Sequence, residues 1–284
     1  MGAVGAWGVL MKAPTRPAVR YHGGKWKLAS WIISHFSPHR VYVEPFGGGA
    51  SVLLRKPRSY AEVYNDLDGE IVNLFRVLRD QGEELTRLLS LTPFARDEFD
   101  LSYQKTDDPL EQARRTVARS FMGFGSAAAT GRPTGFRRNS NRSGTIPAHD
   151  WGNYPKALPA LISRLAGVVI ENTDAKTVML QHDSSATLHY VDPPYVAESR
   201  DAGDDYRFEM TEDDHCNLAE CLKSLQGMVI LSGYPSALYD DLFSDWRKVS
   251  RDAHADGARD RTECLWLNDA AARHQQGCPF GGDA

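Results

Sequence analysis

The strongest constraint on the fold is a strand, a glycine turn, a short helix and a second strand that ends in an acid. Val41–Phe46 reads as an apolar strand, and Gly47-Gly48-Gly49 follows it directly. A helix is predicted from Ser51, and Ala61–Asn65 reads as a second strand that leads into Asp66. This order is typical of a unit in which a helix connects two parallel strands. The segment therefore predicts a parallel α/β sheet with a ligand site where its strands end.

The rest of the chain adds strands to that sheet and interrupts it with a helical segment. Further strands are predicted at Val168–Glu171, Leu188–Val191 and Met228–Leu231, with a closing hairpin of Trp246–Val249 and Glu263–Leu267. Helical patterns cover Leu67–Arg79, Glu83–Leu91, Ala95–Tyr103, Leu110–Phe121 and Thr211–Leu225. We predict a discontinuous sheet domain at 18–80 and 160–270, an inserted domain at 81–159, and flexible termini at 1–17 and 271–284.

Composition is that of an ordinary soluble globular protein, with 42% hydrophobic and 25% charged residues and a net charge of −4. No run approaches the roughly 18 apolar residues that span a bilayer. The four cysteines form no Cys-x-x-Cys pair, so we expect no disulfide framework and a reduced, cytoplasmic setting. His35 and His39 have helical spacing without an acid between them in a metalloprotease pattern, so no metal site is expected.

The most informative motif is Asp192-Pro193-Pro194-Tyr195, which follows the apolar strand Leu188–Val191. Two consecutive prolines cannot extend a sheet, so they stop the strand and hold an acid near an aromatic ring. Because ligands of open α/β sheets bind at the carboxyl ends of strands, a site is expected here. The Asp192 carboxylate and the Pro193 carbonyl can accept two N–H bonds from an exocyclic amine, and the Tyr195 ring can stack on its base. A surface turn is the alternative.

Acids beside the glycine turn favour a cationic ligand. Glu44 directly precedes Pro45-Phe46-Gly47, where it would repel a pyrophosphate. A sulfonium with an ammonium group, as in S-adenosylmethionine, suits this position better than NAD does. Asp66 can accept hydrogen bonds from two ribose hydroxyls or cap the next helix, and both roles can coexist. Glycines in the turn let the backbone approach a ligand closely.

A second glycine-rich element, Tyr21-His22-Gly23-Gly24-Lys25, precedes a predicted helix over Trp26–Phe36. Lys25 can meet the carboxylate of the cofactor, and Tyr21 can pack on or beside the adenine. An ordinary turn before the helix is the alternative, and these residues alone leave both interpretations open.

With these elements in order, the sequence resembles the D12 class of DNA adenine-N6 methyltransferases, which includes the GATC-methylating type. The resemblance spans roughly residues 18–268, within the usual boundary error. It is carried by Tyr21–Lys25, Glu44–Gly49, Asn65–Asp68, Asp192–Tyr195, and by Phe136-Arg137-Arg138-Asn139 followed by Gly144-Thr145-Ile146-Pro147. Tyr21-His22 stands where the family usually has Trp-Ala or Trp-Pro, which bears on packing against the cofactor but not on Lys25.

The resemblance implies S-adenosylmethionine as methyl donor and transfer to N6 of adenine in duplex DNA. It implies cofactor contacts at Tyr21, Lys25, Asp66 and Asp192. We extend these contacts to neighbours in the same motifs, Gly24, Glu44, Phe46, Gly47 and Gly48. Asp174 is added because related enzymes often place an acid there on the adenine, although Glu171 and Asn172 compete for this role. The implied fold is α/β, a Rossmann-like class I methyltransferase sheet with helices on both faces and an inserted, mainly helical target-recognition domain.

Positive charge is concentrated in one segment of the chain. Residues 112–149 contain seven arginines and no acid, although the whole chain is negative. Such segregation suits phosphate binding by a protein that is not basic overall. Arginine and asparagine pair with guanine and adenine at major-groove edges, and phosphate contact is the alternative for any single arginine. We predict DNA contacts at Arg132, Arg137, Arg138, Asn139 and Arg142.

The predicted reaction is direct methyl transfer to N6 of an adenine flipped out of the duplex. Asp192 and Pro193 would orient the nitrogen lone pair, in a turn completed by Pro194 and Tyr195. The alternatives are methylation of cytosine N4, RNA adenine or a glutamine side chain, and a DNA-binding relative without catalysis. We expect double-stranded DNA as partner and a monomer without membrane or metal. The recognition sequence, a hemimethylated preference and a cognate restriction nuclease stay open.

Overall fold

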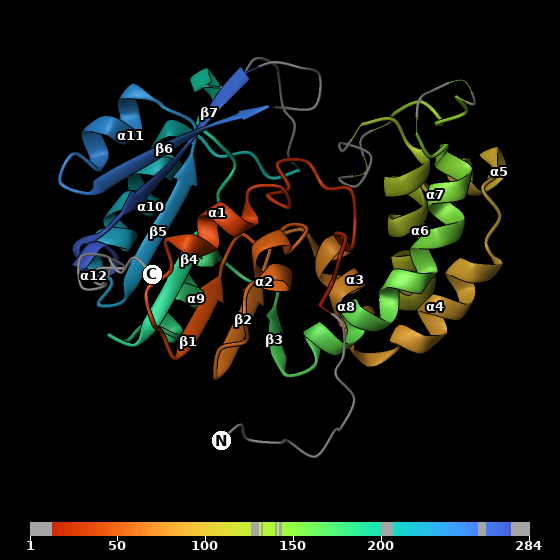
Figure 1. Ribbon diagram of the computed structural model, residues 1–284, viewed down its shortest axis with the longest axis horizontal. Coiled ribbons are helices and arrows are strands. Elements are labelled where there is room, and N and C mark those ends of the chain that lie inside the picture. Colours follow the sequence, from red (N-terminus) through yellow and green to blue (C-terminus); the bar gives the residue numbers. More distant parts are fainter. Residues whose placement is uncertain are drawn as a thin grey trace, which may run out of the picture.

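The computed structural model describes residues 13–125, 131, 133–139, 141, 144–199, 207–254 and 260–273. Its centre is a seven-stranded sheet in the order β3-β2-β1-β4-β5-β7-β6 (Figure 1). The strands are β1 (Val41–Glu44), β2 (Ala61–Asn65), β3 (Val168–Glu171), β4 (Thr187–Val191), β5 (Met228–Gly233), β6 (Arg247–His254) and β7 (Asp260–Leu267). The strands β1 to β5 are parallel, and β7 is antiparallel to β5 and β6. All the predicted strands and the closing hairpin are therefore confirmed.

The strand order reverses between β1 and β4, which lie side by side at the middle of the sheet. Val43 of β1 pairs with Val63 of β2 on one side and with His189 of β4 on the other. In open α/β sheets, ligands bind beyond the carboxyl ends of the strands at such a reversal. Glu44 is the last residue of β1, and Asp192 follows β4 directly, so both acids lie at this position.

Alternating side chains of the central strands bury two cores, one on each face of the sheet. Tyr190 and Ile230 face one core, together with residues of α1 (Ala29–Ser34), α2 (Ser51–Arg55), α3 (Gly69–Asp80) and α12 (Asp269–Arg273). Val191 and Leu231 face the other core, together with residues of α9 (Ala175–Gln181), α10 (Glu212–Ser224) and α11 (Ala237–Leu242). The predicted capping box of Thr211 and Asp214 starts α10. Helices therefore cover both faces, as predicted.

The segment between α3 and β3 is helical and stands at the β3 end of the sheet (Figure 1). It consists of α4 (Gly82–Leu91), α5 (Arg96–Leu101), α6 (Pro109–Met122), α7 (Pro147–Asn153) and α8 (Leu158–Leu165). Leu85, Val117 and Tyr154 of this segment belong to the same buried cluster as Leu74 of α3. The inserted segment therefore shares its core with the sheet, and α8 crosses the boundary predicted at residue 159.

Several boundaries differ from those predicted. The strand β1 stops at Glu44 rather than Phe46, because Pro45 has no N–H for the ladder. The helix α3 begins at Gly69, so Leu67 is exposed rather than on its buried face. The helix α9 was not predicted, because Ala175–Gln181 is a short stretch without a clear helical period. No helix among the described residues is long and apolar enough to cross a membrane.

Packed structure extends further toward both ends of the chain than predicted. The Arg16 guanidinium lies 3.2 Å from the Asp150 carboxylate, so the flexible region does not extend to residue 17. At the other end, Ala271 of α12 is fully buried, and its carbonyl accepts a hydrogen bond from the Ser37 hydroxyl at 3.0 Å. Residues 1–12 and 274–284, which make up most of the predicted flexible termini, lie outside the described residues.

Candidate active site

Glu44 is a buried carboxyl group at the end of β1, with 3% of its surface exposed. Its Oε2 accepts hydrogen bonds from the Tyr42 hydroxyl at 2.7 Å and from the Leu53 N–H at 2.9 Å. Burial raises the pKa of Glu44 to about 8, and the nearby charge of Asp192 also raises it. Glu44 is therefore largely protonated at neutral pH unless a cation lies beside it.

The glycine turn after β1 is crowded by two aromatic rings of the protein itself. A Cβ on Gly47 would lie 2.1 Å from Cε2 of Tyr64, and one on Gly48 would lie 2.9 Å from Cε1 of Tyr21. Gly48 also has a φ of +46°, which favours glycine. The requirement for glycine at these positions therefore follows from internal packing, whereas the sequence suggested close approach of a ligand.

Asp66 and Asp68 follow β2, and they have different roles: Asp66 accepts backbone hydrogen bonds beside the glycine turn, whereas Asp68 caps the next helix. Asp66 accepts hydrogen bonds from the Gly48 N–H at 2.7 Å and from the Asp68 N–H at 2.8 Å, and burial raises its pKa to about 6. Asp68 caps α3 by accepting from the Glu70 N–H at 3.0 Å. The helix cap considered for Asp66 is thus made by Asp68. The Oδ2 atom of Asp68 is buried without a hydrogen-bond partner among the described residues.

Residues 21–25 form a turn in which the Gly24 N–H donates to the Tyr21 carbonyl at 3.2 Å. Lys25 is buried, and its ammonium donates to the Gly23 carbonyl at 2.8 Å. The same nitrogen lies 3.1 Å from Oδ2 of Asp192. The element is therefore a turn that carries Lys25 to the Asp192 carboxylate. A contact between Lys25 and a carboxylate of the cofactor stays a prediction.

The turn after β4 leaves one oxygen of Asp192 without a hydrogen-bond partner among the described residues, and it buries Tyr195. The Oδ1 atom of Asp192 is buried and has no hydrogen-bond partner in the described part of the chain. Tyr195 is 4% exposed, and the Lys25 ammonium lies 4.7 Å from the centre of its ring. Stacking of a base on Tyr195 stays a prediction, and it requires a face of the ring to become accessible.

A cavity of about 330 Å³ joins these elements at the carboxyl ends of the strands. Its wall includes every residue predicted to contact a cofactor, namely Tyr21, Gly24, Lys25, Glu44, Phe46, Gly47, Gly48, Asp66, Asp174 and Asp192. Of the predicted catalytic turn, Asp192 and Pro194 line the cavity, whereas Pro193 and Tyr195 are not among its lining residues. The fold thus brings four separate motifs to one cavity.

Some cavity residues were not singled out from the sequence. Arg207, Phe208 and Met210 line the cavity from the segment before α10. The Arg207 guanidinium donates to Oδ1 of Asp68 at 2.9 Å and to Oε1 of Glu70 at 3.1 Å. A helix-cap pattern could have identified Asp68, because it precedes Gly69-Glu70 and an apolar helical run. Arg207 lies in a polar segment without periodicity, so no local pattern identified it.

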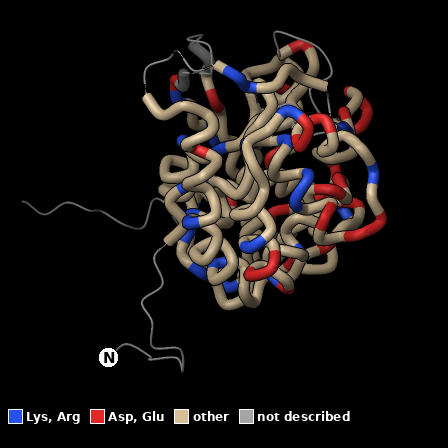
Figure 2. Tube along the Cα trace, turned by 90° about the vertical axis from the view of Figure 1, so that its right-hand side faces the viewer, with Lys and Arg blue, Asp and Glu red and all other residues tan. Residues whose placement is uncertain are grey.

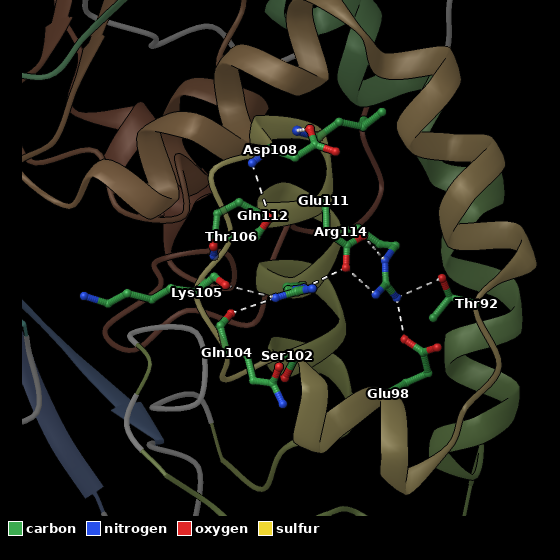
Figure 3. Close-up of polar contacts among 12 residues, drawn as sticks. Thr92, Glu98, Ser102, Gln104, Lys105, Thr106, Asp108, Glu111, Gln112 and Arg114 are labelled. Atoms are coloured by element: carbon green, nitrogen blue, oxygen red, sulfur yellow. Dashed lines mark hydrogen bonds and ion pairs between the residues drawn. The ribbon is translucent and has the colours of Figure 1, made fainter.

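Three arginines of the basic segment are paired with acids, contrary to the expected phosphate-binding surface. The Arg114 guanidinium lies 2.6 Å from Glu98 and 2.7 Å from Glu111 (Figure 3). Arg115 also pairs with Glu111, at 2.6 Å, and the buried Arg119 pairs with Glu70 at 2.6 Å. On this side of the molecule, Figure 2 shows basic and acidic positions interspersed. The local charge count overestimated the positive surface because the partner acids come from outside residues 112–149.

The predicted recognition loop is attached to the end of α6 by an isolated antiparallel bridge between Gly123 and Phe136. Arg137 is half-buried and donates to the Phe121 carbonyl at 3.0 Å, so it anchors the loop. The side chains of Arg138 and Asn139 are exposed. Arg132 and Arg142, which were also predicted to contact DNA, lie outside the described residues. DNA contacts at all these positions stay predictions.

The doubly wound sheet, with a glycine turn after β1 and acids after β1, β2 and β4, has the architecture predicted for a Rossmann-like methyltransferase. Residues 21–255 match the family described as D12 class N6 adenine-specific DNA methyltransferase, and the chain belongs to this family. The predicted fold class and adenine-specific DNA methylation as its activity are thereby confirmed.

Comparison with known proteins gives further matches that cover most of the chain. The Type II methyltransferase M1.LlaDCHI of Lactococcus lactis subsp. cremoris is 25% identical over 261 residues, which cover 83% of this chain and 87% of that protein. A crystal structure from Thermoplasma acidophilum, described as Thermoplasma acidophilum 1320, is 11% identical with a TM-score of 0.30, over 85% of this chain and 84% of that one. This second similarity is too weak to support an inference.

Proposed function

We propose that this DNA adenine methyltransferase takes its methyl group from S-adenosylmethionine bound in the cavity and delivers it to an adenine flipped out of duplex DNA. The observation that carries the proposal is the buried Oδ1 atom of Asp192, which has no hydrogen-bond partner among the described residues. A buried acceptor without a partner destabilises the protein until a donor reaches it. The N6 amine of adenine would supply that donor at the end of β4.

The cavity suits a ligand that is cationic and carries hydroxyl groups. Glu44, Asp66 and Asp192 place carboxyl groups on its wall. When bound, S-adenosylmethionine supplies a methyl group on a positively charged sulfur, which makes that carbon electrophilic. Each oxygen of Asp66 accepts one backbone N–H and keeps a lone pair for a ribose hydroxyl. A cation in the cavity would also favour the ionised form of Glu44.

Asp174 would contact the adenine of the cofactor from the start of α9. Its carboxylate accepts from the Thr177 N–H at 3.1 Å and therefore caps this helix. The side chain remains exposed and lines the cavity, so an oxygen is still available to a ligand. Tyr21 lines the same cavity beside Gly48, where a planar ring would have an aromatic neighbour. These positions support the predicted packing of the adenine.

Asp192 and Pro193 would orient the nitrogen that attacks the methyl group. Lys25 holds Oδ2 of Asp192, so the carboxylate presents Oδ1 to an incoming N–H. The Pro193 carbonyl would accept the second N–H, and the lone pair of N6 would then point at the methyl carbon. This acceleration comes from positioning and electrostatics, without a covalent intermediate on the protein.

The loop after α6 would carry the contacts to DNA. Arg138 and Asn139 have exposed side chains that can reach base edges or phosphates, and Arg137 fixes the start of the loop. We propose GATC as the first recognition sequence to test, because the resemblance includes the GATC-methylating type. The designation Type II belongs to the relative from Lactococcus lactis, and a role in restriction–modification is proposed here only by analogy.

The test is long-read sequencing of plasmid DNA from a methylation-deficient host that expresses the wild type or Asp192→Ala. We expect N6-methyladenine in one short motif with the wild type and none with Asp192→Ala, which should keep most of its DNA binding. Glu198→Ala is the matched control, because Glu198 is an exposed acid near the same turn and is absent from the cavity wall.

Other outcomes would point to the alternatives. Substantial methylation by Asp192→Ala would refute the role of this carboxylate. A soluble wild type that binds the cofactor in calorimetry but leaves adenine unmodified would favour cytosine N4 or RNA adenine as acceptor. A wild type that binds DNA but not S-adenosylmethionine would be a relative without catalysis.

A further inference from the structure

The hydroxyl of Tyr195 is bound by two residues that lie far from it in the sequence. It donates a hydrogen bond to Oε2 of Glu263 at 2.9 Å and lies 3.1 Å from the Ser232 hydroxyl. All three residues are buried, with exposed fractions of 4% for Tyr195, 7% for Glu263 and 1% for Ser232. A buried carboxylate at this place is unusual because its burial is unfavourable unless it accepts hydrogen bonds.

The sheet explains how these residues meet. Ser232 on β5 pairs with Leu265 on β7, and Glu263 is two residues from Leu265 on the same strand. Because side chains alternate along a strand, Ser232, Leu265 and Glu263 point to the same face of the sheet. From the turn after β4, the Tyr195 hydroxyl reaches both Ser232 and Glu263. The antiparallel strand β7 thereby contacts the predicted catalytic turn.

We propose that Glu263 is a positioning residue for methyl transfer: its carboxylate holds the Tyr195 hydroxyl and so fixes the ring against which the flipped adenine stacks. This inference rests on the proposed function of Asp192–Tyr195. Residues 194–196 belong to no helix or strand, so backbone hydrogen bonding of a regular element does not orient the ring. The Glu263 carboxyl oxygen accepts the hydrogen bond of the Tyr195 hydroxyl, so Glu263 sets the direction of that hydroxyl.

Two further neighbours contact the aromatic ring of Tyr195. The Tyr234 ring meets Tyr195 edge-on, with centres 4.6 Å apart, and the Lys25 ammonium lies 4.7 Å from the ring centre. Both neighbours contact the ring itself rather than the hydroxyl, and an incoming base would have to share this space. The bond to Glu263 can persist when a base arrives, because neither Tyr195 nor Glu263 is among the residues that line the cavity.

The test is a double-mutant cycle with Glu263→Ala, Tyr195→Phe and the combined variant. Methylation of a duplex is measured at saturating S-adenosylmethionine, and 2-aminopurine at the target adenine reports the flipped base. We expect each single variant to lose about tenfold to a hundredfold in kcat, as for a misplaced reacting group. The combined variant should lose no more than the worse single variant, because both substitutions remove one hydrogen bond. The Kd for S-adenosylmethionine should stay within about twofold, since neither side chain lines the cavity.

Two further variants separate positioning from folding. Glu263→Gln keeps a carbonyl acceptor, so it should recover part of kcat and the wild-type 2-aminopurine signal; it also carries the comparison if Glu263→Ala fails to fold. Thr262→Val is the control on β7, because the Thr262 hydroxyl bonds to Asp252 at 3.1 Å and not to Tyr195.

The outcomes distinguish this inference from the proposed function. Additive losses of kcat in the double-mutant cycle, or a wild-type kcat for folded Glu263→Ala, would overturn the positioning role of Glu263. The proposed function would still stand if the wild type methylates adenine and Asp192→Ala does not. A wild type that neither methylates nor flips adenine would overturn both.

Discussion

At the scale of single residues, burial sets the charge of the acids around the cavity. The pKa is raised by burial to about 8 for Glu44 and to about 6 for Asp66. A protonated Glu44 avoids an uncompensated buried charge while the cavity holds no cation. A cation that enters would favour the ionised form and so gain a negative partner. The same side chain is therefore compatible with a stable fold and with a cationic ligand.

Glu44 predicts how stability depends on pH in the ligand-free protein. Its pKa is 4.5 ordinarily and about 8 in the folded protein, so the folded state retains a proton that the unfolded state has lost. The contribution of this proton to the free energy of unfolding is complete below the ordinary pKa of Glu44, and it is lost as pH rises through the pKa of Glu44 in the folded protein. Glu44→Gln imitates the protonated form. It should therefore remove a decline in the free energy of unfolding with rising pH of at most about 1.4 kcal/mol per pH unit. Urea unfolding across this range measures it, and an unchanged slope in the variant would contradict it.

At the scale of elements, α6 and the loop after it carry arginines that serve two different purposes. Arg114 and Arg119 are buried and join this helix to acids on neighbouring helices, whereas Arg138 lies exposed in the loop that follows. Burial and pairing make the first group part of the helical packing, because an unpaired buried charge is strongly unfavourable. Only the exposed group is available for phosphates or bases.

Substitution of these arginines should therefore separate stability from DNA binding. Arg119→Ala should lower the free energy of unfolding by about 3 kcal/mol, because it breaks a buried ion pair. Arg138→Ala should leave stability unchanged within about 0.5 kcal/mol. It should weaken DNA binding and, if it contacts a phosphate, reduce the slope of log K against log salt by about one. Thermal unfolding and salt-dependent fluorescence anisotropy measure both effects. Normal stability of Arg119→Ala would refute the division into buried arginines that stabilise the fold and exposed arginines that bind DNA.

At the scale of the whole molecule, one buried cluster extends from the sheet into the helical segment. It includes Tyr42 of β1, Phe75 of α3 and Leu161 of α8. The Tyr154 hydroxyl also donates to the Ala18 carbonyl, which ties this segment to the start of the chain. A segment that shares its core in this way leaves apolar surface uncovered when it is removed.

We expect the helical segment to depend on the sheet for its stability. Residues 81–159 expressed alone should lack a cooperative thermal transition and should bind a hydrophobic dye. The full chain should unfold in a single transition by circular dichroism and by tryptophan fluorescence. A folded, monomeric fragment with a sharp transition would instead show that the insertion is an independent domain.

The sequence by itself determined the strands, the Thr211–Asp214 cap and the motifs at the strand ends, including Asp66 and Asp192. These features depend on neighbours in the chain, because periodicity, proline and capping residues act locally. Only the tertiary structure decided that Arg119 is buried and that the Tyr195 hydroxyl meets Glu263. Each of these contacts joins residues that are far apart in the sequence. Their meeting depends on how strands and helices are arranged in space, which no local pattern specifies.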